Sequence, residues 1–286
     1  MTLKQAIVAT LAYHDIFTYP LTSQQTHSYL IQKATLDSVE ENLKDLQTKK
    51  QVFSKNDYLY LKGRGAIVKT RESRLRNSAS KLKRANFYAS IIKFIPSVQL
   101  VALTGALSMQ NSDREDDIDI MVITSKNTLW TTRLLVNLAL LNYKRKPGEP
   151  HTKNKACLNI FLSENSLRVS TQNLYTAHEV AQVKPIWQRG NIYQHFTKAN
   201  SWVKRYLPNW QPYPLDVFNT NKQSRFSAIA SGILSVAEPI AKFVQLRYMH
   251  RRITSEKIGD TQLFFHPGNT QQYVLGKYEA KLKSLR

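Results

Sequence analysis

The 286-residue sequence predicts an α+β fold with two or three domains, because the chain is long enough to form more than one core. Apolar residues recur at helical spacing towards both ends of the chain. Two short apolar runs near the middle, at 98–103 and 118–124, are typical of buried strands. We therefore expect four regions, which cover residues 1–63, 64–97, 98–170 and 171–286.

Residues 1–63 carry the pattern of three helices followed by a β-hairpin. Apolar residues at helical spacing mark the first helix and the third helix: Leu3, Ile7, Val8 and Leu11, then Leu36, Val39, Leu43 and Leu46. Thr22 followed by Gln25 resembles a capping box that opens the second helix. Two short β-segments then flank Asn56-Asp57, which favours a hairpin turn. This order of elements is typical of a winged-helix domain.

Winged helices often bind DNA through the third helix. Here the third helix carries acidic side chains, which repel phosphates: Asp37, Glu40, Glu41 and Asp45. The neighbouring lysines, Lys44, Lys49 and Lys50, offset only part of this charge. The pattern favours a scaffold or protein-docking role for this domain, and sequence reading of DNA is the alternative.

Residues 64–95 predict one long basic helix that ends before Pro96, so region 64–97 connects the first domain to the next. The net charge of +21 and the pI of about 10 favour a polyanionic partner such as nucleic acid. The candidate nucleic-acid or phosphate patch on this helix consists of Arg71, Arg74, Lys81 and Arg84. The alternative is an ordinary solvated basic face.

A cluster of carboxylates stands out in this basic chain: Asp113, Glu115, Asp116, Asp117 and Asp119. Like charges this close together are unfavourable unless a cation lies among them. Side chains at i and i+2 of a strand share one face, so Asp117 and Asp119 are expected to point the same way. Hard oxygen ligands favour Mg²⁺ or Mn²⁺. A solvated acidic loop is the alternative, but it does not explain why these two residues lie in an apolar strand.

Gly105 directly follows the first predicted strand, where a glycine lets the backbone approach a ligand and present N–H groups to a polyphosphate. A glycine turn, a dozen residues and then Asp117-Ile118-Asp119 on an apolar strand resemble the polymerase-β-type nucleotidyltransferase superfamily. The resemblance covers about residues 98–165, and an uncharacterised prokaryotic subgroup with an N-terminal winged helix looks similar over a longer stretch.

This resemblance implies a nucleotidyltransferase-type mixed β-sheet with helices and a nucleoside triphosphate, ATP among them, as substrate. It implies that Asp117 and Asp119 hold catalytic Mg²⁺, or Mn²⁺ in its place. Nucleotide contacts are expected from Thr104, Gly105, Ala106 and Ser108.

Two positions depart from the family pattern. The family often has serine directly after the glycine, where this chain has Ala106, and Ser108 is the candidate substitute. The third carboxylate of the family lies on a following strand, where this chain offers Asn159. An amide can coordinate a metal but cannot accept a proton at neutral pH. Asn159 therefore joins Asp117 and Asp119 as a candidate catalytic residue, with proton transfer assigned elsewhere.

A basic loop at residues 144–155 precedes the strand that carries Asn159. Its position in the chain places mobile cations near the metal site. Lys153 and Lys155 are therefore candidates for neutralising triphosphate charge during transfer. A plain exposed loop is the alternative.

Residues 171–286 predict a C-terminal helical region with helices at about 173–184, 192–206 and 224–255. Its most apolar stretch, 226–244, is interrupted by Glu238, Pro239 and Lys242. It therefore lacks the run of about 18 uncharged apolar residues that a transmembrane helix needs. We expect a buried or groove-lining helix there. Contact with a membrane surface is the alternative, because basic residues flank the stretch: Arg225, Lys242, Arg247, Arg251 and Arg252.

The single cysteine, Cys157, excludes an internal disulfide and a zinc site built from several cysteines. It lies in an apolar run, which favours a buried and inert thiol. No secretory signal pattern is visible at the N-terminus, so a cytoplasmic location is the expectation.

Three functions fit these observations. The first is a Mg²⁺-dependent nucleotidyltransferase that moves a nucleoside monophosphate to a hydroxyl of a nucleic acid, a protein or a small molecule. The second is a catalytically weakened form of the same fold that senses nucleotide and binds nucleic acid or protein. The third is a basic structural adaptor with no nucleotide site. The sequence does not indicate the oligomeric state.

Overall fold

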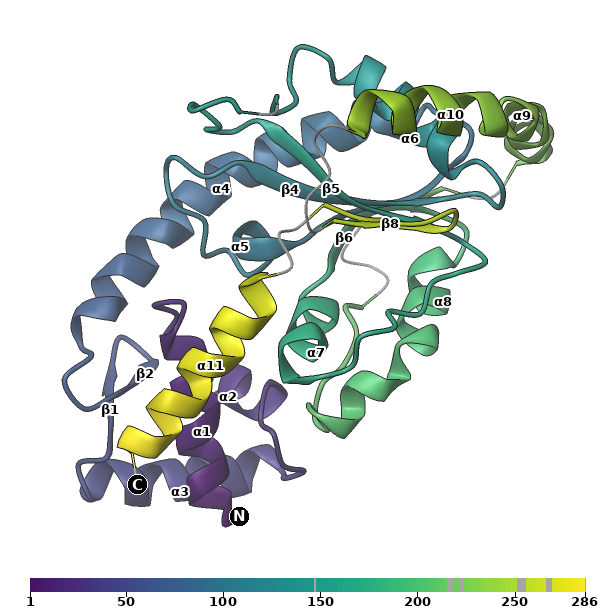
Figure 1. Ribbon diagram of the computed structural model, residues 1–286. Helices are drawn as coiled ribbons and strands as arrows, with labels where there is room; N and C mark the ends of the chain where they lie inside the picture. Colours follow the sequence, from purple (N-terminus) through teal and green to yellow (C-terminus); the bar gives the residue numbers. More distant parts are fainter. Residues whose placement is uncertain (147, 215–218, 222–223, 251–255, 266–268, 286) are drawn as a thin grey trace.

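The computed structural model describes residues 1–146, 148–214, 219–221, 224–250, 256–265 and 269–285. Helices and strands alternate irregularly along the chain, and the strands of the larger sheet run in both directions, so the predicted α+β class is confirmed (Figure 1). The first three helices and a hairpin form one end of the molecule, and a seven-stranded sheet with its helices forms the other.

The N-terminal elements follow the predicted order. They are α1 (Leu3–Asp15), α2 (Ser23–Ser28), α3 (Leu36–Thr48), β1 (Val52–Lys55) and β2 (Tyr58–Leu61). A capping box begins α2, because the side chains and backbones of Thr22 and Gln25 exchange hydrogen bonds of 3.1 and 3.2 Å. Asn56 and Asp57 have φ angles of 50° and 65°, as a two-residue hairpin turn requires.

Helix α4 (Ala66–Ile92) runs from the N-terminal elements along the side of the large sheet (Figure 1). Its 27 residues make it the longest helix that the structure describes. Ala85, Tyr88 and Ile92 lie on the face that packs against the sheet, whereas Arg76 and Lys83 on the opposite face are exposed. The helix therefore joins the two ends of the molecule, and it ends before Pro96 as expected.

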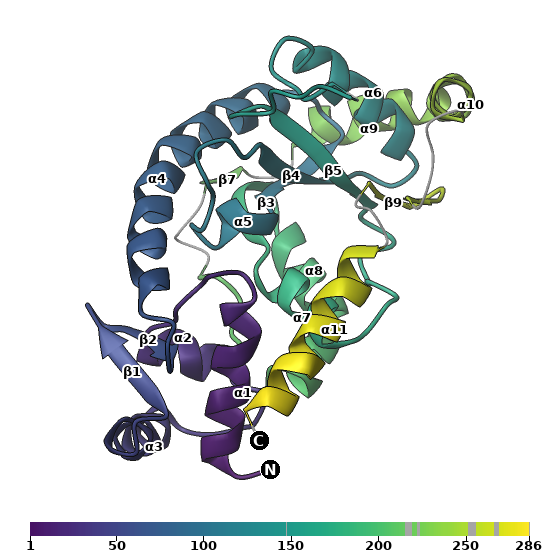
Figure 2. The same ribbon diagram turned by 60° about the vertical axis from the view of Figure 1, so that its left-hand side comes forward.

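The large sheet has the order β7-β6-β3-β4-β5-β9-β8 (Figure 2). Its strands are β3 (Val98–Leu103), β4 (Ile118–Thr124), β5 (Ala156–Ser163), β6 (Lys184–Arg189), β7 (Asn219–Asn221), β8 (Lys257–Ile258) and β9 (Gln262–Phe264). The central pair β4–β5 is parallel, and β4 is antiparallel to β3 on its other side. This arrangement brings the start of β4 beside the start of β5 and the end of β3.

The region after residue 171 contains helices where they were expected, but the structure corrects its description as a helical domain, because strands occur there as well. Four strands from that region, β6 to β9, extend the sheet at both of its edges. Pro185 and Trp187 lie in β6, which pairs with β3 far back in the chain. β6 is buried at its four central positions by contacts with distant segments. Its residues therefore do not show the alternation of apolar and polar side chains that marks a half-buried strand in a sequence. The last part of the expected helix at 224–255, residues 251–255, lies outside the described residues.

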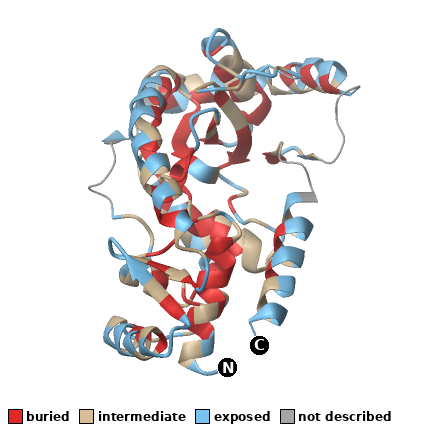
Figure 3. Cartoon of the chain, turned by 90° about the vertical axis from the view of Figure 1, so that its left-hand side faces the viewer, coloured by how far each residue is buried: buried red, intermediate tan, exposed pale blue. Residues whose placement is uncertain are grey.

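Helices cover both faces of the sheet. The helices that follow α4 in the chain are α5 (Gly105–Ser108), α6 (Leu129–Ala139), α7 (Leu174–Ala181), α8 (Ile192–Ala199), the 3-10 helix η1 (Ser201–Arg205), α9 (Arg225–Val236), α10 (Glu238–Met249) and α11 (Asn269–Ser284). Helices α4, α6 and α10 pack on one face, and α7, α8 and η1 pack on the other (Figure 1). The central strands are consequently buried on both sides (Figure 3), which explains their unbroken apolar runs.

Helix α11 returns from the sheet to the N-terminal helices. Val274 and Tyr278 are 2% and 7% exposed, and they belong to the same apolar cluster as Ala6 and Leu11 of α1. The described part of the chain therefore brings its first and last helices into contact, as Figures 1 and 2 both show.

Asp15 connects three of these elements by charge. Its side chain is 3% exposed and forms ion pairs with Arg64, at 2.7 Å, and with Lys281 of α11. Arg64 lies just before α4, so the carboxylate holds the ends of α1, α4 and α11 together. Removal of the buried Asp15 carboxylate would leave the positive charges of Arg64 and Lys281 without their partner, which is unfavourable.

We expect Asp15→Ala to lower the free energy of unfolding by roughly 2–3 kcal/mol, because the cations of Arg64 and Lys281 lose their buried partner. Chemical denaturation of the purified protein measures this. Asp45→Ala is the matched control, since Asp45 also pairs with two lysines but at the surface, and it should change stability little. If both variants lost the same free energy of unfolding, the burial of Asp15 would not explain the loss.

Candidate active site

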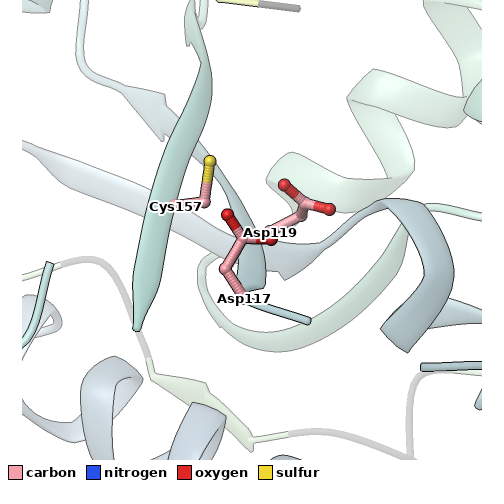
Figure 4. Close-up of side chains that lie close together, drawn as sticks. All are labelled: Asp117, Asp119 and Cys157. Carbon is pink, nitrogen blue, oxygen red and sulfur yellow. The ribbon is translucent and has the colours of Figure 1, made fainter. Parts of the chain in front are cut away.

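The acidic residues Asp117 and Asp119 converge at the start of β4. Asp117 immediately precedes the strand and Asp119 is its second residue, so both side chains point to the same side (Figure 4). Cys157 is the register partner of Asp119 on the parallel strand β5. One ligand atom from each of the three residues lies within 4.8 Å of the others. The structure thus brings the two predicted metal ligands together and adds a thiol that the sequence argument had treated as inert.

Gly105 is in contact with Asp119 of this carboxylate pair. Its φ angle is +59°, a conformation that favours glycine, and a Cβ atom at this position would overlap Oδ2 of Asp119. The backbone N–H of Thr104 donates to the carbonyl of Asp119 at 3.2 Å. The end of β3 and the start of β4 are therefore held so close that only a glycine fits between them and leaves Asp119 in place.

Asn159 lies beneath the carboxylates and is 1% exposed. Its amide group donates to Oδ1 of Asp119 at 2.9 Å and to the hydroxyl of Thr104 at 3.1 Å. The predicted residues Thr104, Asp119 and Asn159 therefore form one hydrogen-bonded group. In this arrangement Asn159 orients Asp119, which is a role that an amide can fill without accepting a proton.

Burial raises the pKa of Asp119 to about 7, and the neighbouring negative charge of Asp117 adds to the effect. Asp119 has no ion-pair partner in the part of the chain that the structure describes. The pKa of Cys157 is also raised, by burial and by the two carboxylates, so the group is a neutral thiol at physiological pH. The site carries negative charge that its own residues do not fully neutralise.

These donors fit a hard divalent cation. Carboxylate oxygens are the ligands that Mg²⁺ and Mn²⁺ prefer. The raised pKa of Asp119 indicates that its ionised form is unfavourable unless a cation lies close to it. A neutral thiol is a poor ligand for such an ion and a better one for a soft metal after deprotonation. Asp117 and Asp119 are therefore the residues that could hold Mg²⁺, with Cys157 at the edge of the site.

Arg145 is the residue that the sequence argument missed in the basic loop. Its guanidinium donates to Oδ2 of Asp117 at 3.0 Å and its side chain is half exposed. The two lysines predicted for this role have other partners: Lys153 pairs with Glu115 at 3.0 Å, and Lys155 pairs with Glu149. The loop position was the usable signal, but sequence alone does not show which of its cations reaches the carboxylates.

A second residue that was missed is Glu179 on α7. Burial raises its pKa to about 7, and its charge contributes to the raised pKa of Asp119. It lines a cavity of about 530 Å³ together with Gly105, Ala106 and Asp116. Cavities of this size accommodate small-molecule ligands. No sequence motif indicated Glu179, because α7 reaches the site only through the packing of its helix under the sheet.

The remaining residues predicted to bind nucleotide lie at the same turn. Ala106 is exposed at the cavity, whereas Ser108 is 3% exposed. The Ser108 hydroxyl donates to the carbonyl of Gly105 at 2.7 Å, so in this conformation it closes the turn. Contact between Ser108 and a phosphate remains a prediction, and it requires this hydrogen bond to break.

The four cations predicted as a nucleic-acid patch do not share one exposed face. Arg71 and Lys81 are 3% and 2% exposed, and they donate to the carbonyls of Gln110 and Asp116. Arg74 bonds to the carbonyl of Phe17 at 3.1 Å, and Arg84 is exposed. Burial of Lys81 lowers its pKa. Arg71 and Lys81 therefore attach the acidic segment to α4, which leaves Arg84 as the exposed member of the set.

Two buried histidines border the same cavity. His14 and His178 lie against Tyr13, whose ring stacks on that of His178 at a centroid distance of 4.0 Å. Burial lowers the pKa of His14 to about 3 and that of His178 well below its ordinary value. Both rings are neutral at physiological pH, which suits a structural role in the packing of α1 against α7.

Comparisons of the chain with protein-family models, with curated proteins and with solved structures found no match.

We expect Asp119→Asn to stabilise the metal-free protein at about pH 8 by roughly 2–4 kcal/mol, because the ionised carboxylate is unfavourable in its buried position. The pKa is raised on folding, so the native state binds the extra proton between about pH 4 and pH 7, and wild-type stability falls as pH rises through this range. The gain of the variant should therefore shrink towards about pH 4. Denaturation in the presence of a chelator measures it.

Glu115→Gln is the control for this prediction, since Glu115 lies in the same acidic segment but is exposed. At about pH 8 it should change the free energy of unfolding far less than Asp119→Asn does, because its side chain is exposed. A stabilisation by Asp119→Asn that stays constant from acid to neutral pH would contradict the assigned burial effect.

Proposed function

We propose that this chain is a Mg²⁺-dependent nucleotidyltransferase. The observation that carries the proposal is the convergence of Asp117 and Asp119, with Asp119 against Gly105, and Gly105 itself lines a cavity of about 530 Å³. A metal bound by two carboxylates beside an exposed glycine turn is an arrangement suited to a nucleoside triphosphate. When bound, Mg²⁺ would polarise the phosphate oxygens and neutralise charge that develops during transfer.

The chain's own residues supply the other requirements of the proposed reaction. Backbone N–H groups at Gly105 and Ala106 would face the triphosphate, and Arg145 brings a cation to the same edge of the site. Asn159 holds the Asp119 carboxylate in its orientation. Glu179 is the candidate general base, because its pKa of about 7 suits proton transfer near neutral pH and it lines the same cavity.

The N-terminal elements support a winged-helix module as part of the proposal. Three helices and a hairpin occur in the appropriate order, and α3 exposes Asp37, Glu40 and Glu41. An acidic surface on that helix is unfavourable for contact with DNA phosphates. We therefore propose that the module docks a protein or positions an acceptor. The acceptor hydroxyl belongs to a nucleic acid, a protein or a small molecule.

A second candidate function is nucleotide sensing without transfer. Two observations favour it: Asn159 stands where the family resemblance implies a third carboxylate, and the Ser108 hydroxyl is engaged with the backbone of Gly105. In that case the chain binds nucleoside triphosphate and Mg²⁺ and changes its affinity for a partner without releasing pyrophosphate.

The test begins with thermal unfolding of the protein with each of four nucleoside triphosphates, with and without Mg²⁺. A nucleotide at about one hundred times its dissociation constant should add about 2.7 kcal/mol of stability. We expect the effect to require Mg²⁺ and to disappear in the double variant Asp117→Ala/Asp119→Ala. The double variant Asp113→Ala/Glu115→Ala removes the same charge from exposed positions of the same segment and should keep the effect.

Labelling of an acceptor from α-labelled nucleotide then separates the two functions. Transfer predicts label incorporation and pyrophosphate release, both lost in Asp117→Ala/Asp119→Ala. Sensing predicts binding alone, and Asn159→Asp should then raise metal affinity or activity. Incorporation that survives the loss of both aspartates would contradict the assigned site, and the absence of any Mg²⁺-dependent thermal effect would leave the adaptor role.

A further inference from the structure

Helices α9 and α10 have an inverted distribution of apolar residues. Their buried positions are mostly small or polar, and include Ser227, Ser231, Ala241 and Gln245 at 2–7% exposed. Their outward positions are large and apolar, with exposed fractions of 54–79%: Phe226, Ile229, Ile233, Val236, Ile240, Phe243, Val244 and Tyr248. We call these eight side chains the apolar face. A surface helix of a globular protein ordinarily shows the opposite pattern.

Polar contacts fix this orientation. The carboxylate of Glu238 accepts hydrogen bonds from the backbone N–H groups of Trp130 and Thr131 at 2.8 and 2.9 Å, so it caps the N-terminal end of α6. The amide of Gln245 donates to the carbonyl of Trp130 at 2.8 Å, and the hydroxyls of Ser231 and Ser125 are 3.3 Å apart. These specific bonds attach the pair to the sheet domain and leave the apolar face outward.

The attachment of the pair, rather than its length, favours a position along a surface. No single helix among the described residues is long and apolar enough to cross a bilayer, although α9 and α10 together meet that requirement with a bend of 57° between them. Each has 12 residues, or about 18 Å at 1.5 Å per residue, against a hydrocarbon thickness of about 30 Å. Neither helix alone is long enough, and the polar bonds along the inner side of the pair hold both helices against the sheet domain, which favours an orientation in the plane of a surface.

The net positive charge of the chain favours an anionic surface as the partner that covers the apolar face. At a net charge of +21, two copies of the chain repel each other, whereas an anionic lipid surface attracts each of them. The charges described on α10 agree: Glu238 is engaged in capping α6, Lys242 pairs with Asp260 at 2.6 Å, and Arg247 is exposed. Arg251 and Arg252 lie outside the described residues.

We propose that the apolar face inserts into the headgroup region of an anionic lipid bilayer, with α9 and α10 lying in the plane of the membrane. Insertion buries the large apolar side chains, and the positive charge of the chain strengthens the attachment. The face lies on the α6 side of the sheet domain, away from the N-terminal helices (Figure 1). It would therefore hold the protein at a membrane whatever reaction the carboxylate site performs.

The test is co-sedimentation of the full chain with vesicles made from equal parts of phosphatidylcholine and phosphatidylglycerol. We expect binding to these vesicles and much weaker binding to vesicles of phosphatidylcholine alone. The double variant Ile233→Ser/Phe243→Ser should bind roughly 100-fold more weakly, from about tenfold for each lost apolar group. Its melting temperature should match that of the wild type, because both side chains are about two-thirds exposed.

Tyr273→Ser is the matched control, since Tyr273 is a large side chain of α11, 58% exposed, near the N-terminal helices. It should bind vesicles as the wild type does. The proposal is overturned if the wild type does not sediment with anionic vesicles, or if the double variant sediments equally well. It is also overturned if the wild type is a dimer in sedimentation equilibrium and the double variant a monomer, because a second copy would then cover the apolar face.

Discussion

The close approach of Gly105 to Asp119 is the constraint on which the rest of the site depends. A side chain at Gly105 would occupy the position of a carboxylate oxygen, so the turn after β3 and the start of β4 have to be built together. The Thr104–Asn159–Asp119 hydrogen bonds then fix the orientation of that carboxylate. Among the described residues Arg145 forms an ion pair with Asp117 and none pairs with Asp119, which leaves a position suited to a divalent cation.

The basic helix α4 acts mainly as a support for this site. Arg71 and Lys81 each reach a backbone carbonyl of the segment between Gly105 and Asp117, and Ser78 accepts from the N–H of Ser112 at 3.1 Å. These contacts add to the bonds that Tyr19 and Asn154 make to the same segment, and together they fix its path between two strands. Two of the cations that suggested a nucleic-acid partner, Arg71 and Lys81, are thus used inside the protein, whereas other cations of α4, such as Lys83 and Arg84, are exposed.

The sequence was informative where a local rule sufficed. The orientation of Asp117 and Asp119 follows from the two-residue period of a strand, and the turn at Asn56-Asp57 follows from the residue types that tolerate positive φ. It was not informative where position depends on pairing between distant segments. Cys157 lies beside Asp119 because of the register of β4 and β5. Glu179 lines the cavity because of the way α7 packs against the sheet, and β6 is a strand because it pairs with β3. The apolar stretch 226–244 was expected to be buried or to line a groove, and most of its large side chains are exposed instead.

The contact between α1 and α11 has a consequence for the order in which the protein can be completed. Translation delivers the first helices early, but the apolar cluster around them includes Val274 and Tyr278, which are synthesised more than two hundred residues later. Until α11 emerges from the ribosome, Ala6 and Leu11 lack part of their final surroundings, and Asp15 lacks Lys281. The earliest part of the chain to appear is therefore among the last to reach its native packing.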